Sequence, residues 1–280
     1  MKKLFFILTA GLMGGTAVAQ DLPQPSPAAK VEQVVGLTAI SFDYSRPSVK
    51  GRTIFGDLVP YDEVWRLGAN ACTKITLSTE AFVQGQSIEA GTYAVFAIPH
   101  ANGTWKILFN SNTEQRGAGS YDSALDVATA MVKTKESPLT ETFTISLTDV
   151  KNNSANLSIK WENVHVELPI EVETEKIAQA NIKAAIAKGE DLDKVYYKAA
   201  DYYFNSLNNE KKALGYIHKG LSAKEGHALY FLRAQILKKQ GHTKEAIEEA
   251  GKAYDLAITA EQKGWSDYIK ENVENWKKKD

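Results

Sequence analysis

The sequence has little cysteine and little histidine, and both shortages limit the chemistry it can carry. Its one cysteine, Cys72, excludes an intramolecular disulfide. Cys72 begins an alternating stretch, so we expect a small buried side chain rather than a nucleophile. The histidines have no zinc-ligand spacing. We expect exposed polar roles for His100 and His165, and surface or packing roles for His218 and His227. The histidines of the chain are His100, His165, His218, His227 and His242.

Signature motifs of common enzymes are also missing. The chain contains no phosphate-binding Walker loop, no GxSxG nucleophile elbow and no HExxH metal motif. The neighbouring carboxylates Asp62 and Glu63 lie in a loop, where consecutive side chains diverge. We therefore name no catalytic residue, no metal ligand and no cofactor, and the sequence favours a non-enzymatic role while leaving catalysis open.

Neither half of the chain has a strong excess of positive charge. Residues 20–174 contain 12 Lys and Arg against 18 Asp and Glu, a net charge of −6. Residues 175–280 contain 19 against 16, a net charge of +3. A nucleic-acid partner is not expected from this balance.

Long apolar runs are absent after the first 20 residues. The chain opens MKKLFFILTAGLMGGTAVAQ, in which two lysines precede an apolar stretch and small residues precede Gln20. This pattern predicts a signal peptide over residues 1–19, cut after Ala19, and a periplasmic or secreted protein. No transmembrane segment is expected in the mature chain.

The first positive signal in the sequence is the two-residue period of β-strands. Residues 20–34 hold three prolines and predict an extended arm without packed structure. Within residues 35–174, apolar and polar residues alternate, and Asn102-Gly103 and Asn152-Asn153 mark tight turns. This part predicts an antiparallel β-sandwich or barrel.

The period changes to that of a helix after residue 174. Asp191 and Thr243 suit N-caps, and Gly241 suits a helix end. Gly215 and Gly251 fall inside helices, and we expect close helix contact to explain them. The expected helices of the 175–280 domain are 175–188, 192–206, 210–222, 226–240, 243–257 and 260–278.

The helical half repeats itself at an offset of 33–34 residues. Ala200 corresponds to Ala234, and Ala213 corresponds to Ala246. Small residues at equivalent places let paired helices approach closely, and the pattern resembles the tetratricopeptide repeat. The expected fold is therefore α+β with two domains, the second made of tetratricopeptide-like helical hairpins.

The stretch YSRPSVKGRTIFGDLVPYDEVWRLGAN, residues 44–70, combines cations, aromatics and glycines. With DYSRP, VPY, VWR, AGTY and Tyr121-Asp122, it resembles an uncharacterised family of exported bacterial β-domains, many followed by helical repeats. The resemblance implies no biochemical activity. Two positions depart from it: Asp62 stands where we expect a small residue, and Leu67 where we expect threonine.

Guanidinium groups beside aromatic rings form a competent surface for an acidic or sugar-like ligand. The alternative is structural, with Arg46 paired to Asp43 or Glu63 and Trp65 closing one end of the domain, its N–H bonded to a carbonyl. The candidate ligand-binding residues are Asp43, Arg46, Lys50, Arg52, Tyr61, Trp65, Arg66, Asn70, Tyr121 and Asp122.

Three functions follow from these alternatives. The first is an exported binding or interaction protein, with an acidic or glycan ligand on the β-domain or a protein partner on the helical repeats. The second is an envelope hydrolase acting on a glycan or peptide, and the third is a purely structural envelope component. Convergence of Arg46, Arg66 and Asn70 on an open concavity would favour binding.

Overall fold

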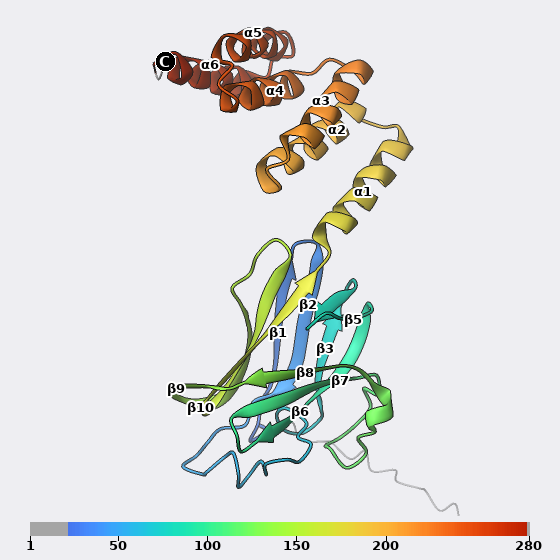
Figure 1. The fold of residues 1–280 in the computed structure, drawn as a ribbon, viewed down its shortest axis with the longest axis vertical. Coiled ribbons are helices and arrows are strands. Elements are labelled where there is room, and N and C mark those ends of the chain that lie inside the picture. The colour runs from blue at the N-terminus through green and yellow to red at the C-terminus, as the bar shows by residue number, and fades with distance from the viewer. Residues whose placement is uncertain (1–21, 279–280) are drawn as a thin grey trace, which may run out of the picture. The chain divides into compact units, whose positions relative to one another are not determined.

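The structure is a computed structural model that describes residues 22–278 (Figure 1). The expected signal peptide, residues 1–19, lies outside these residues. The chain divides between Glu173 and Thr174 into two compact units, each with its own core.

The first unit consists of two antiparallel sheets. One has the strand order β1-β2-β3-β6-β7-β8, with bounds Ala28–Val35, Thr38–Ser45, Thr73–Leu77, Gly91–His100, Thr104–Asn110 and Asp126–Lys133. The other has the order β5-β4-β10-β9, with bounds Gln86–Ile88, Ala81–Val83, Ser154–Val172 and Lys135–Thr148. A short 3-10 turn, η1, spans Ser123–Leu125.

Alternation along the strands produces the core between the two sheets. Phe42, Val95 and Phe109 of the first sheet are fully buried, as are Phe143 and Leu157 of the second. Asn102-Gly103 lies between β6 and β7, and Asn152-Asn153 lies between β9 and β10, as their turn chemistry predicted. The prediction of an antiparallel β-domain is confirmed.

The prediction of an unpacked arm through residue 34 is wrong beyond Pro27. β1 pairs with β2 along its whole length, from Ala28 opposite Ser45 to Val35 opposite Thr38. Gly36 turns the chain between them with a φ of 58°, a left-handed conformation that glycine adopts without strain. The prolines end before the strand begins, so they do not interrupt its hydrogen bonds.

The second unit is helical. Its elements are α1 (Thr174–Lys188), α2 (Leu192–Asp201), the π-helical segment η2 (Tyr202–Ser206), α3 (Glu210–Ala223), α4 (His227–Lys239), α5 (Thr243–Thr259) and α6 (Lys263–Lys278). Ala200, Ala213, Ala234 and Ala246 are all fully buried, so the four equivalent alanines of the repeat lie at helix contacts. The expected helical hairpins are confirmed, and the two-domain α+β fold with them.

Details of the helix ends differ from the sequence expectations. Gly241 does follow α4 with a φ of 87°. The N-cap of α5 is His242 rather than Thr243, and Asp191 precedes α2 without a capping hydrogen bond from its side chain. None of the helices in the described residues is long and apolar enough to cross a membrane.

Candidate functional site

The segment between β2 and β3, residues 46–72, carries most of the predicted site, and we call it the crossover. Backbone hydrogen bonds tie it to both sheets. Trp65 forms a β-bridge with Ala97 of β6, and the Val49 amide donates to the Glu141 carbonyl of β9 at 2.8 Å. The crossover is therefore held at its middle and near its start.

Trp65 belongs to the core rather than to a recognition surface. Its ring is 9% exposed and stacks on Trp161 at 5.7 Å between centroids. Its Nε1 donates to the Gly68 carbonyl at 3.1 Å. The structural alternative for Trp65, a buried ring with its N–H bonded to a carbonyl, is thus confirmed. The surrounding aromatic cluster is Phe55, Trp105, Phe143 and Trp161.

The two arginines at the start of the crossover bind the protein itself. Arg46 donates from Nε to the Phe143 carbonyl at 3.0 Å and from Nη2 to Thr144 Oγ1 at 2.8 Å. Arg52 donates to the carbonyls of Val49 and Ser48. The expected pairing of Arg46 with Asp43 or Glu63 is wrong, because β9 lies beside Arg46 and its carbonyls accept the guanidinium.

Four other predicted residues are exposed. Asn70 donates to the Ser26 carbonyl at 3.0 Å and to Ser45 Oγ at 3.2 Å. Tyr61 lies against Gly56, where an added Cβ would come within 2.7 Å of the ring. Lys50 lies at the start of the crossover and Asp43 on β2.

Both departures from the resembled family have left-handed backbone. Asp62 has a φ of 65° and Leu67 a φ of 51°. Asp62 Oδ1 also accepts from His100 Nδ1 at 2.5 Å, and the Asp62 amide donates to the Pro99 carbonyl. A glycine would adopt this φ without strain, whereas aspartate is less favourable there. The Asp62 side chain in turn contacts His100 of β6.

A second, smaller apolar cluster lies on the other face of the six-stranded sheet, and Arg66 lies beside the loop that follows β7. This cluster contains Cys72, Ala94, Phe96 and Leu108. An added Cβ at Gly117 would lie 3.0 Å from Arg66 Nη1, so the guanidinium rests on the loop 111–122. Within residues 22–278, its side chain has no recorded hydrogen bond or ion pair.

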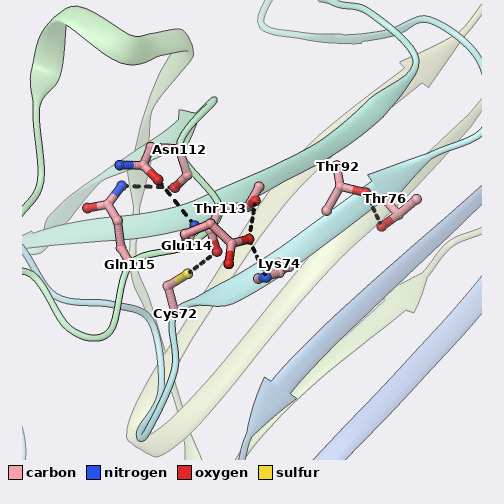
Figure 2. Close-up of polar contacts among 8 residues, drawn as sticks. All are labelled: Cys72, Lys74, Thr76, Thr92, Asn112, Thr113, Glu114 and Gln115. Atoms are coloured by element: carbon pink, nitrogen blue, oxygen red, sulfur yellow. Dashed lines mark hydrogen bonds and ion pairs between the residues drawn. The ribbon is translucent and has the colours of Figure 1, made fainter.

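The loop 111–122 covers this face through side-chain hydrogen bonds. Figure 2 shows Asn112, Thr113, Glu114 and Gln115 gathered beside the start of β3. Cys72 Sγ donates to the Thr113 carbonyl at 3.7 Å, and burial raises the pKa of its thiol. The expected small buried cysteine is confirmed.

The predicted pair Tyr121 and Asp122 closes the same loop. Tyr121 donates its hydroxyl to Asp126 Oδ2 at 2.6 Å, and burial together with Asp126 raises the pKa of the phenol. Asp122 caps η1 by accepting from the Ala124 amide at 2.9 Å. Both side chains therefore hold the loop in place.

The histidines remain apart from one another. The His165 side chain is only 15% exposed, and its Nε2 lies 2.8 Å from Ser158 Oγ. The expectation that His165 is exposed is therefore wrong, because β10 bends at its register shifts and brings Ser158 beside it. Among the described residues, no group of three or more His, Cys, Asp or Glu could hold a metal ion.

Open hollows occur in the helical unit. One, a small hollow of about 110 Å³ that we call the inner groove, is lined by side chains of α2, η2, α4 and α6. Its residues recur at helical spacing, for example 228, 231, 232 and 235, a signal that the sequence reasoning missed. The inner groove is lined by Tyr197, Asp201, Asn205, Ala228, Phe231, Leu232, Gln235, Trp265 and Tyr268.

A larger hollow of about 550 Å³ adjoins the inner groove. The two share Tyr197, Ala228 and Trp265, so they form one continuous surface. His227 lies at this junction with its ring 5.1 Å from that of Trp265, and burial lowers the pKa of its imidazole.

Comparison with known proteins gives one match. Residues 26–170 match the family model described as "Protein of unknown function (DUF2911)". Neither the curated proteins nor the solved structures contain a match.

Proposed function

The chain belongs to the DUF2911 family of proteins of unknown function, as the resemblance predicted, and on that premise we propose that it is an exported interaction protein. In this proposal the β-domain is a scaffold, and the helical hairpins bind an extended segment of a protein partner. Export rests on the predicted signal peptide alone.

The observation that carries the proposal is the inner groove. Tyr197 and Trp265 meet edge to face at 6.1 Å beside it, and Tyr268 meets the buried ring of Phe231 at 5.4 Å. Gln235 of α4 is half-buried and makes no recorded side-chain hydrogen bond within residues 22–278. The Gln235 amide can both donate to and accept from a peptide backbone, and the rings of Tyr197, Trp265 and Tyr268 lie beside it.

The β-domain contributes less support for binding. Arg46, Arg52 and Asn70 donate to backbone carbonyls of their own domain, and Trp65 is in the core. Groups already engaged in this way would lose those bonds on taking a ligand. The structural alternative is therefore favoured for the crossover, while the interaction role is assigned to the helices.

A peptide selection tests the proposal. Random peptides are selected on phage against the full mature chain, and the affinities of the enriched peptides are measured by calorimetry. Asn205→Ala/Gln235→Ala should weaken binding about tenfold or more, which corresponds to about 1.4 kcal/mol. Both side chains are at the groove and neither is in the core.

Lys244→Ala/Glu248→Ala on α5 is the matched control, because these residues are exposed and do not line the groove. It should leave the affinity unchanged. Equal binding by wild type and the Asn205→Ala/Gln235→Ala variant, or the absence of any enriched peptide, would contradict the proposal.

A further inference from the structure

A second groove lies in the helical unit, between α1 and α3, and we call it the lysine groove. Its volume is about 570 Å³. It shares no lining residue with the inner groove, so the two surfaces can be tested separately. It is lined by Gln179, Ile182, Lys183 and Ile186 of α1, Tyr203 of η2, and Lys212, Gly215, Tyr216 and Lys219 of α3.

Each helix contributes one regular face to the lysine groove. On both α1 and α3 the lining residues follow the spacing i, i+3, i+4, i+7, which places them in one line along a helix. Such a face normally packs against the protein's own core. Here it borders open space, so it is available to a partner.

The floor of the lysine groove is apolar. Ile182 and Ile186 line it from α1. Opposite them, the rings of Tyr203 and Tyr216 stack at 5.5 Å with an interplanar angle of 13°. This floor can accept one aliphatic or aromatic side chain of a ligand.

The rim carries positive charge. Lys212 Nζ lies 4.8 Å from the centre of the Tyr203 ring, and Lys219 Nζ lies 5.9 Å from that of Tyr216. Lys183 adds a third ammonium from α1, and none of the lining residues is a carboxylate. Lys183 and Lys219 form no recorded ion pair in the described part of the chain, so their charge is free to attract an anion.

Gly215 keeps the lysine groove open. It is exposed in the interior of α3, and an added Cβ would meet nothing within 4 Å. Glycine costs a helix about 1 kcal/mol relative to alanine, so α3 gives up stability at this position. Close helix contact does not explain that cost, because nothing lies within 4 Å of an added Cβ.

We infer that the lysine groove binds an acidic segment of a protein partner, with one apolar side chain of that segment inserted between α1 and α3. Charge complementarity selects the acidic residues, and the recessed floor selects the apolar anchor. A membrane surface fits less well, since amphipathic membrane binding needs apolar side chains that project beyond the cations. Here Lys212 and Lys219 lie over the rings of Tyr203 and Tyr216.

Glu175 already forms an ion pair of the kind that an acidic ligand would form with the rim. Its Oε1 lies 3.1 Å from Lys212 Nζ, so one carboxylate of α1 competes for the rim. Glu175→Gln should free Lys212 and strengthen binding of an acidic peptide by roughly two- to fivefold, the range expected from one exposed ion pair.

The experiment uses the full mature chain and displayed peptides of about twelve residues composed of Asp, Glu, Ser, Leu, Phe and Tyr. Enriched peptides should combine several acidic residues with one apolar anchor, and their affinity should fall as salt is raised. Gly215→Leu should reduce the affinity at least about tenfold by filling the floor. Lys183→Ser/Lys219→Ser should reduce it comparably and flatten the salt dependence.

Gly251→Leu is the matched control. Gly251 is also exposed inside a helix with nothing within 4 Å of an added Cβ, but it does not line the groove. It should leave the affinity unchanged. The inference is overturned if no acidic peptide is enriched, or if Gly215→Leu and Gly251→Leu weaken peptide binding equally. Binding to anionic phospholipid vesicles is measured in parallel. The inference is also overturned if Gly215→Leu abolishes vesicle binding and leaves peptide binding unchanged.

Discussion

At the scale of single residues, the sequence predicts which side chains matter better than it predicts their partners. Arg46 was a candidate ligand-binding residue, with pairing to Asp43 or Glu63 as the structural alternative, and it instead donates to the Phe143 carbonyl, 97 residues away in the chain. That pairing depends on β9 crossing beside β2, which no local pattern encodes. Cys72 was predicted correctly because its burial follows from strand alternation alone.

His165 gives a pH prediction at this scale. Burial lowers the pKa of its imidazole below the ordinary value of 6.5, with Lys160 and Lys135 adding to the effect and Glu167 opposing it. The unfolded chain therefore takes up the proton at a higher pH than the folded chain does. Stability should be full above about pH 6.5, decline as the pH falls below that value, and level off below the folded pKa.

The measurement is urea unfolding of wild type and His165→Gln at about pH 7.5 and about pH 5.5. Glutamine retains an amide that can reach Ser158, so the variant should fold and lose less stability on acidification than wild type. Identical pH dependence of the two proteins would show that His165 does not carry the effect.

At the scale of elements, periodicity predicts strands and helices because both depend on neighbouring residues. The β1 strand was missed because the three prolines before it predicted an extended arm, although the alternation of a strand starts at Ala28. The inner groove and the lysine groove were also missed, although each of their faces has helical spacing. A face at that spacing is usually core, and only packing reveals that these border open space.

Two glycines of α3 should respond oppositely to the same substitution. At Gly220, an added Cβ would lie 2.7 Å from Leu229 Cδ1 and 2.9 Å from Tyr196 Cβ. Gly220→Ala should therefore destabilise the helical unit by about 1–3 kcal/mol, since Tyr196 Cβ cannot move independently of α2. At Gly215 there is open space, and Gly215→Ala should stabilise by about 0.5–1 kcal/mol.

Urea unfolding followed by far-ultraviolet circular dichroism measures both changes. Because both residues lie in the same helix, the comparison removes the common gain in helix propensity. A gain in stability for Gly220→Ala would mean that α2 and α4 are not packed closely on α3 at this point.

At the scale of the whole molecule, the change of period near residue 174 is the feature with the widest consequence. Each unit has cores made only from its own residues, and the division falls between Glu173 and Thr174. The family match covers residues 26–170, so it describes the first unit and leaves the helical hairpins without a family assignment. The grooves proposed for binding lie outside the matched region.

Separate cores predict that the two units fold independently. A fragment of residues 22–173 should unfold cooperatively and keep a near-ultraviolet signal from its packed tryptophans, since Trp65 contacts both Trp105 and Trp161 within it. A fragment of residues 174–280 should be helical, and the two spectra should add to that of the intact chain. A fragment of residues 22–151 is the control: it lacks β10, which pairs with both β4 and β9, and should not fold. If residues 22–173 behaved like this control, the β-domain would require the helices for its own stability, and its role as a self-sufficient scaffold would fail.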